Sequence, residues 1–180
     1  MITYIALLRG INVSGHKKII MADLRVLLDA LGYNNVITYI QSGNVIFKSN
    51  ETNVAILQNQ IYVAILESYN FEVEVLVKKR NDLEKIVEQN PYTDTKDLEE
   101  NKIYFVLLKE IPEIELVRKL KNIEFENEQF IVSNECIYLR CVLGAGKAKC
   151  NNNFIEGKLK ISVTSRNYRT VQKLLELSKD

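Results

Sequence analysis

The sequence has little of the side-chain chemistry on which metal centres, disulfide frameworks and catalytic triads depend. Its 180 residues include three cysteines and a single histidine, His16. An odd number of cysteines argues against a disulfide framework and fits a reducing compartment. Cys136 and Cys141 flank four residues of one predicted strand, and their odd separation sends the two side chains to opposite faces. We therefore expect three free thiols, no metal site and no cofactor.

No stretch of the sequence is apolar for long enough to span a membrane, which needs roughly 18 such residues in a row. The first ten residues, MITYIALLRG, have no basic residue before their apolar stretch and no small-residue cleavage site after it. They predict a strand rather than a signal peptide. We expect a cytoplasmic protein that does not enter a membrane.

The sequence also lacks the motifs of nucleotide hydrolysis and of triad catalysis. LLRGINVSGHKK follows the first predicted strand, yet it contains neither GxGxxG nor GxxxxGK[ST]. GAGKAK at 144–149 has no first glycine at the required distance, and Ala148 stands where a hydroxyl should meet magnesium. Nothing in the sequence places a serine and an acid beside His16. No group of residues therefore specifies an enzyme, and no catalytic residue is assigned.

The net charge of +1 conceals an uneven distribution of charge along the chain. Residues 1–50 carry five basic and two acidic side chains, and residues 140–180 carry nine and three. Residues 51–139 carry ten basic and eighteen acidic side chains. If the two ends meet in space, they form one basic region that favours an anionic partner. The alternative is that the charges scatter over a solvated surface.

Apolar periodicity predicts the same order of elements twice. The expected elements of the first half are strands at 2–8, 36–41, 44–48 and 72–78 and helices at 21–31, 53–68 and 81–89. Those of the second half are strands at 102–109, 128–133, 136–142 and 159–164 and helices at 113–121, 152–157 and 167–178. Each half reads βαββαβ, the split unit of the ferredoxin-like fold, and has one further helix. The predicted fold class is α+β, with two tandem ferredoxin-like subdomains.

The predicted domain boundaries follow from this repetition. Residues 1–90 form one subdomain with its extra helix, the acidic residues 91–101 a linker, and residues 102–180 the second subdomain with its helix. An Arg-Asn pair stands between a strand and a helix in each half, at 80–81 and at 166–167, which supports an internal duplication. Asparagine is also a good helix N-cap, and that role alone would explain both asparagines.

Aromatic residues on the predicted strands raise a second possibility, because ferredoxin-like sheets can stack RNA bases on exposed rings. The residues concerned are Tyr4, Tyr39, Phe47 and Tyr104. The third strand, NVIFKS, lacks the Lys/Arg-Gly-aromatic-Gly signature of such sheets. Single-stranded RNA binding is therefore the weaker alternative to a small ligand, beside a purely structural or interaction role.

Polar residues interrupt apolar runs at three places, and these form the predicted ligand site. They are the end of the first strand, the turn in TYIQSGNVIF, where Ser42-Gly43 is expected to make the turn, and the start of the last helix. A helix N-terminus favours an anion, and arginine can bind a phosphate through two parallel hydrogen bonds. We expect a phosphate-bearing small molecule to bind in one pocket between the subdomains. The expected ligand-binding residues are Arg9, Asn12, Lys17, Gln41, Ser42, Asn44, Arg166 and Asn167.

Five segments of the sequence together resemble a bacterial family of unknown function, DUF1697. They are ALLRGINVSG, MADLR, YIQSGNVIF, NPY and TSRNYRTVQKL, in this order and spacing. The sequence departs from the family at Ser14, where a second glycine is common, and at Tyr168, where tryptophan is common. The resemblance implies a bacterial cytoplasmic protein built of two ferredoxin-like parts, and it implies no reaction.

Overall fold

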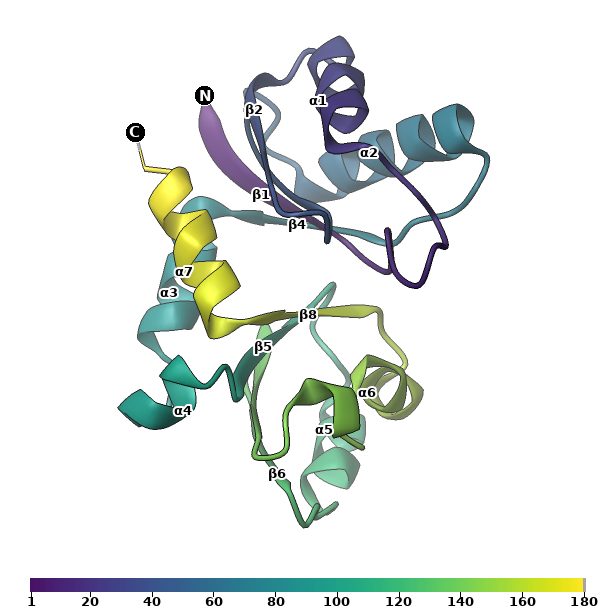
Figure 1. Ribbon diagram of the computed structural model, residues 1–180. Coiled ribbons are helices and arrows are strands. Elements are labelled where there is room, and N and C mark those ends of the chain that lie inside the picture. Colours follow the sequence, from purple (N-terminus) through teal and green to yellow (C-terminus); the bar gives the residue numbers. More distant parts are fainter. Residues whose placement is uncertain (180) are drawn as a thin grey trace. The chain divides into compact units, whose positions relative to one another are not determined.

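The computed structural model describes residues 1–179, which contain two four-stranded antiparallel sheets with their helices (Figure 1). One compact unit comprises Met1–Glu84 and the end of the chain from Leu174, and the other comprises Lys85–Lys173. The predicted boundaries, with subdomains at 1–90 and 102–180 and a linker at 91–101, stay a prediction. No helix within residues 1–179 combines the length and the apolar character needed to cross a membrane.

The first sheet has the strand order β2-β3-β1-β4, which is that of a ferredoxin-like βαββαβ unit. Its strands are β1 (Ile2–Leu8), β2 (Asn34–Tyr39), β3 (Asn44–Ser49) and β4 (Val75–Lys79). The connecting helices are α1 (Met21–Ala30) and α2 (Val54–Tyr69), and α3 (Arg80–Glu88) follows β4 directly. Figure 1 shows α1 and α2 on the same face of the sheet. The core beneath them is built from Leu24 and Leu28 of α1, Leu57 and Ile61 of α2, and alternate strand residues such as Tyr4.

The second sheet repeats this order as β6-β7-β5-β8. Its strands are β5 (Ile103–Leu108), β6 (Glu128–Val132), β7 (Cys136–Cys141) and β8 (Val163–Asn167). The helices of this half are α4 (Thr95–Glu99), α5 (Ile114–Lys121), the 3-10 turn η1 (Ala145–Lys147), α6 (Asn152–Leu159) and α7 (Tyr168–Leu177). Residues of α5 and α6 pack on one face of the sheet around Ile137 and Leu139. The predicted fold class, two tandem ferredoxin-like subdomains each followed by a helix, is confirmed.

The two sheets also agree in register, which locates the two Arg-Asn pairs. The last residue of β4 pairs with Tyr4 of β1, and the last residue of β8 pairs with Tyr104 of β5. On this register Arg80 begins α3, whereas Arg166 lies within β8. Both pairs stand at a junction between strand and helix, as predicted, but they are two residues out of step and are not copies of one position.

The turn between β2 and β3 is longer than predicted. β2 ends at Tyr39 and β3 begins at Asn44, so residues 40–43 form the turn rather than 42–43 alone. β2 also begins earlier, at Asn34, and its register shifts between Asn34 and Ile37 because of a bulge in which Asn35 has a φ of 53°. Apolar alternation does not reveal an extra residue in one strand. The sequence therefore placed β2 at 36–41 instead of at Asn34–Tyr39.

Three elements of the second half also differ from prediction. The helix expected at 152–157 continues to Leu159 and ends in a left-handed residue, Lys160, so β8 begins at Val163 rather than at 159. The Glu156 carboxylate accepts a hydrogen bond from the Val163 amide at 2.9 Å and so fixes this later start. The segment expected as a linker contains the short helix α4, which the Asp94 side chain caps by accepting from the amide of Asp97.

Candidate functional site

Six of the eight predicted site residues lie at one end of the first sheet. They belong to two segments that we call the β1 corner, residues 9–19 after β1 and residues 40–44 around the β2–β3 turn. The two segments meet through the main chain, because the Leu8 amide donates to the Gly43 carbonyl at 2.7 Å. The structure therefore brings together Arg9, Asn12, Lys17, Gln41, Ser42 and Asn44.

Asn12 holds the two segments of the β1 corner together. Its side-chain amide donates to the carbonyls of Ile19 and Gln41, both at 2.9 Å, and its Oδ1 accepts from the Ile19 amide at 2.9 Å. Its φ is 54°, a left-handed conformation that asparagine adopts more readily than most residues. Both hydrogens of the side-chain amide are thus used within the protein, so Asn12 fixes the shape of the corner.

The turn itself is held by a second asparagine. Asn44 is fully buried, and its side-chain amide donates to the Tyr39 carbonyl at 3.0 Å and to the Ser42 hydroxyl at 2.9 Å. The side chain of Gln41 is exposed. The main-chain carbonyl of Gln41 is the group that accepts the hydrogen bond from Asn12. Ser42 therefore helps to close the turn, while the Gln41 side chain reaches solvent.

A close approach between the turn and β1 explains the glycine at position 43. A Cβ atom there would lie 2.6 Å from the Leu8 Cβ and 2.9 Å from the Ile11 Cδ1, and the φ of Gly43 is 77°. No other residue fits both the conformation and the space. The positive φ of Gly43 is a conformation that glycine adopts at no steric cost.

The loop of the β1 corner has an unusual backbone. Five of its residues have a positive φ, namely Gly10, Asn12, Ser14, Gly15 and Lys17. Left-handed residues placed between right-handed ones turn neighbouring amides to a common side, and such concave runs of amides bind anions. Three of the five are not glycine, and each such residue costs roughly 1–2 kcal/mol in strain.

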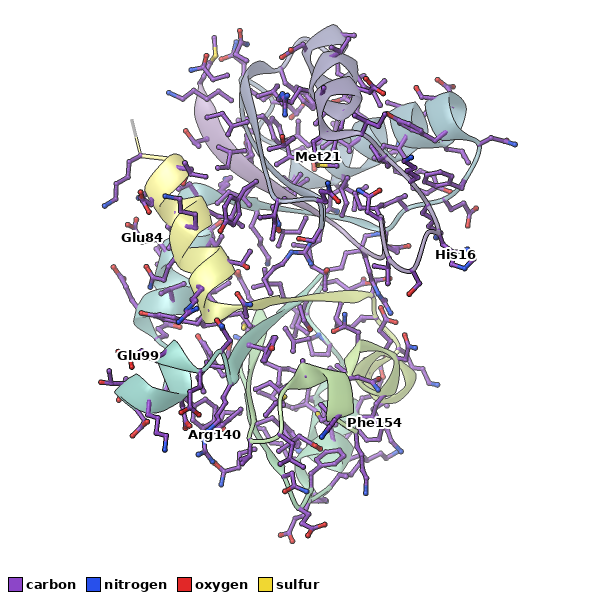
Figure 2. All side chains as sticks on the ribbon, in the orientation of Figure 1. His16, Met21, Glu84, Glu99, Arg140 and Phe154 are labelled. Carbon is purple, nitrogen blue, oxygen red and sulfur yellow. The ribbon has the colours of Figure 1, made fainter. Side chains whose placement is uncertain are left out.

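The charge of the β1 corner is more balanced than the sequence suggests. The Lys17 ammonium donates to the Glu72 carbonyl at 2.7 Å, and the Arg9 amide donates to the Glu74 carbonyl at 2.9 Å. Glu72 and Glu74, which belong to the acidic middle of the chain, thus lie beside the basic loop. His16 is exposed at the tip of this loop (Figure 2). The separation of charge along the sequence is therefore not a separation in space at this corner.

The other two predicted site residues lie in the second unit. Arg166 donates to the Thr164 hydroxyl at 3.2 Å and to the Ser165 carbonyl at 2.9 Å, and burial lowers the pKa of its guanidinium to about 10. It therefore stays charged at neutral pH. Asn167 accepts from the Thr170 amide at 2.8 Å and so caps α7, which is the structural role considered for it. That these two residues join the other six in one pocket stays a prediction.

All three cysteines are buried, and none of them forms a disulfide. Cys141 and Cys150 belong to the core under α5 and α6, whereas Cys136 at the other end of β7 lies on the opposite face of the sheet. Burial raises the pKa of Cys141 to about 11 and that of Cys150 to about 12. Within residues 1–179 no three histidine, cysteine or acidic side chains lie close enough to hold a metal ion.

Two of the four aromatic residues considered for RNA stacking are internal, and the other two, Tyr39 and Tyr104, are half-buried. Tyr4 and Phe47 are fully buried and stack on each other with ring centroids 5.6 Å apart. The Tyr33 ring stacks on the Phe47 ring, with ring centroids 4.5 Å apart. Tyr104 packs against the second core. Tyr4 and Phe47 are therefore inaccessible to a nucleic-acid base.

Sequence reasoning missed an ion-pair cluster around Asp97 of α4. The Asp97 carboxylate accepts from the Arg140 guanidinium at 2.5 Å and lies 3.6 Å from the Lys102 ammonium. Figure 2 shows Arg140 next to the helix that carries Glu99. The signal in the sequence was the spacing of Asp94 and Asp97, since an N-cap residue followed three positions later by an acid is typical of a helix start.

Comparison with known proteins gives the family of this chain. Residues 1–138 match the model of the family described as protein of unknown function (DUF1697), and the chain belongs to this family. The segment TSRNYRTVQKL lies beyond the matched residues. A similar solved structure is that of a conserved bacterial protein from Streptococcus pneumoniae, which is 24% identical with a TM-score of 0.76 over 99% of both chains. This similarity shows the fold alone. No curated protein matches the chain.

Proposed function

We propose that this is a cytoplasmic protein that binds an anionic, phosphate-bearing small ligand at the β1 corner. The observation that carries the proposal is the left-handed backbone of three non-glycine residues in one loop, Asn12, Ser14 and Lys17. A fourth, Ile40, lies in the adjoining turn. Strained residues persist where the surrounding structure holds them, and they concentrate at ligand-binding sites.

The chemistry of the loop suits an anion. Left-handed residues recur in anion-binding loops, and Arg9, Lys17 and Lys18 add positive charge. Asn12 keeps this arrangement in place without a ligand, so binding does not have to order the loop. Its role in the proposal is therefore to position the loop.

Two neighbouring acids determine how strongly salt should affect binding. Glu72 and Glu74 lie beside the same loop, so the attraction for a phosphate comes from local hydrogen bonds more than from a wide positive field. Local contacts are screened less by salt than long-range steering. We therefore expect binding to weaken only moderately between low and physiological ionic strength.

A thermal-shift screen of the full chain tests the proposal. The probes are inorganic phosphate, mononucleotides and sugar phosphates, each paired with its unphosphorylated parent. A ligand at about 100 times its dissociation constant should add about 2.7 kcal/mol of stability. The parent compounds should add nothing, because the phosphate supplies the contacts.

Two variants with the same change of charge make the test specific to the loop. Lys18→Gln should weaken binding several-fold, whereas Lys119→Gln on the exposed face of α5 should leave it unchanged. Equal behaviour of the two variants, or no stabilisation by any phosphate, would overturn the proposal. Stabilisation by short RNA alone would support the RNA-binding alternative. No stabilisation by any of the probes would support a structural role.

Arg166→Lys tests whether the second unit takes part. If Arg166 contacts the ligand, this variant loses most of the ligand-induced stabilisation while its unliganded melting temperature barely changes. Lysine keeps the charge and loses the paired donors that suit a phosphate. A large fall in the unliganded melting temperature would show instead that the buried guanidinium is structural.

A further inference from the structure

We propose that the free edge of β6 binds an extended, basic peptide segment of another protein by strand addition. β6 is an edge of the second sheet, because the strand order is β6-β7-β5-β8 (Figure 1). A peptide can join such an edge as a further strand, which main-chain hydrogen bonds hold and pockets for alternate side chains select. The inference concerns the second unit and is independent of the anion site proposed for the first.

The hydrogen bonds at the two ends of β6 identify which of its main-chain groups face outward. The Ser133 amide donates to the Cys136 carbonyl, and the Val142 amide donates to the Asn127 carbonyl, both at 2.9 Å. In an antiparallel pair, residues that exchange hydrogen bonds alternate with residues that do not. Every second residue from Asn127 to Ser133 therefore bonds to β7. The residues between them, whose amides and carbonyls point away from β7, are Glu128, Phe130 and Val132. Within residues 1–179 these outward main-chain groups have no hydrogen-bond partner.

This edge is regular over its whole length. All five residues of β6, Glu128–Val132, pair with β7 without a shift in register. The strand contains neither proline nor lysine nor a bulge, three features by which edge strands commonly avoid pairing. β6 therefore presents an uninterrupted row of donors and acceptors to an incoming strand.

A hollow beside β6 offers room for the side chains of an added strand. It has a volume of about 330 Å³ and lies between the start of β6 and residues 121–125, which lead into it. Gln129 lines the hollow together with Glu128 and Phe130, although side chains alternate between the two faces of a strand. The hollow therefore borders the edge of the strand rather than one face. Phe125 and Phe130 supply apolar surface, so an apolar side chain of the added strand would fit there.

The charge of this edge favours a basic partner over a second copy of the chain. Residues 122–135 contain four glutamates and no lysine or arginine. Among the described residues that line the hollow, Lys121 is basic, whereas Glu124 and Glu128 are acidic. A second copy paired along β6 would add four more glutamates to the same ladder, and like charges on neighbouring strands destabilise a sheet. Lysine side chains on the added strand would instead offset the glutamates.

Calorimetric titration of the full chain with the peptide acetyl-KTVTVTK-amide tests the inference. Its lysines and valines share one face, so the valines can enter the hollow while the lysines lie near the glutamates. We expect saturable binding, and binding at least fivefold weaker for acetyl-ETVTVTE-amide. No saturable binding of the lysine peptide, or equal affinity for the two peptides, would overturn the inference.

Methylated peptides test strand addition itself. An added strand whose valines lie on the same face as Phe130 turns the valine amides toward β6 and the threonine amides toward solvent. Methylation of both valine nitrogens should therefore abolish binding, whereas methylation of two threonine nitrogens should preserve it. Equal effects of the two modifications would contradict main-chain pairing.

Variants of the chain test the same edge from the protein's side. Val132→Pro removes an outward amide and no bond to β7, a position at which edge strands accept proline, so it should lower the affinity for the lysine peptide at least fivefold. Glu124→Gln beside the hollow should weaken binding several-fold, whereas Glu113→Gln at the other end of α5 should keep wild-type affinity. Wild-type affinity in Val132→Pro, or equal behaviour of the two glutamine variants, would contradict the assignment. If Val132→Pro lowers the melting temperature, the methylated peptides and the glutamine variants still test the proposal.

Sedimentation of the chain without peptide tests the alternative occupant, a second copy. We expect the wild type and Val132→Pro to sediment alike. A wild-type dimer that Val132→Pro dissociates would assign the edge to a second copy and overturn the inference.

Discussion

The side-chain amide of Asn12 lies 2.9 Å from the main-chain carbonyl of Gln41, although 29 residues separate the two along the chain. One side chain thereby joins the loop after β1 to the turn between β2 and β3. The same side chain also binds the amide and the carbonyl of Ile19 at the far end of the loop. The shape of the β1 corner therefore depends on a residue that a sequence pattern marks only as polar.

Asn12→Ala should lower the free energy of unfolding by about 2–3 kcal/mol, because it removes three hydrogen bonds worth roughly 1 kcal/mol each. Urea unfolding followed by circular dichroism measures the change. Gln41→Ala is the matched control, since only its main-chain carbonyl takes part, and it should stay within about 0.5 kcal/mol of wild type. Similar losses in the two variants would show that the bridge is not the stabilising element.

Gly43→Ala and Gly10→Ala together separate backbone strain from crowding. Both glycines have a positive φ, of 77° and 70°, but only at position 43 would a Cβ meet other atoms within 4 Å. Gly10→Ala should lower the free energy of unfolding by about 1–2 kcal/mol, the cost of left-handed alanine. Gly43→Ala should lower it by a further 1–3 kcal/mol or so, because the side chain would overpack against Leu8 and Ile11. If the two variants lost the same free energy of unfolding, the residues of β1 would have shifted to make room for the new side chain without loss of stability.

Ile40→Asn should stabilise the protein. A β-branched residue at a φ of 50° is strained, and asparagine adopts this conformation more easily. Ile40 is 50% exposed, so little burial is lost, and we expect a gain of roughly 0.5–1 kcal/mol. Ile37→Asn on β2 is the control. Ile37 is 40% exposed and extended, so its replacement should lower the melting temperature. A loss of stability in Ile40→Asn would mean that the isoleucine contacts outweigh the strain.

Asp97→Asn should make the protein less sensitive to acid. The hydrogen bond from Arg140 lowers the pKa of the Asp97 carboxyl below its usual value near 3.9, against the opposing effect of burial. The folded protein then binds this proton less readily than the unfolded chain, so the stabilisation is complete above about pH 4 and disappears as the pH falls further.

Urea unfolding at pH 7, 5 and 3 measures this effect. Asp97→Asn should cost about 2 kcal/mol at pH 7 and at pH 5, since it breaks a charged hydrogen bond, and less at pH 3. Glu99→Gln removes an exposed charge from the same helix and should show no such trend. A difference between wild type and Asp97→Asn that stays constant from pH 7 to pH 3 would contradict the ion-pair assignment.

The overall architecture could be predicted because it depends on local periodicity. Leu24 and Leu28 recur at helical spacing ahead of Gly32, and strands such as Ile2–Leu8 are continuous apolar runs. Repetition of this pattern in the second half then gave two ferredoxin-like units. Each of these signals is contained in a window of about ten residues, so no knowledge of distant partners was needed.

The details of the site could not be predicted because they depend on distant partners. Asn12 appeared as one more polar residue, and its bridging role requires the position of Gln41. The acids of 92–101 suggested a solvated linker, yet Asp97 is buried against Arg140, 43 residues away. No sequence pattern marked Glu128, because the sequence of one strand does not show that the side chain of its first residue is buried.

The bulge in β2 affects how this protein can meet other copies of itself. β2 is an edge strand, and a regular edge offers a row of free amides and carbonyls to which a foreign strand can add. The extra residue between Asn34 and Ile37, with Asn35 turned into a left-handed conformation, puts the two ends of this row out of step. An incoming strand could pair with one end of β2 and not with both. The irregularity that apolar alternation does not reveal thus makes this edge of the sheet a poor template for strand addition.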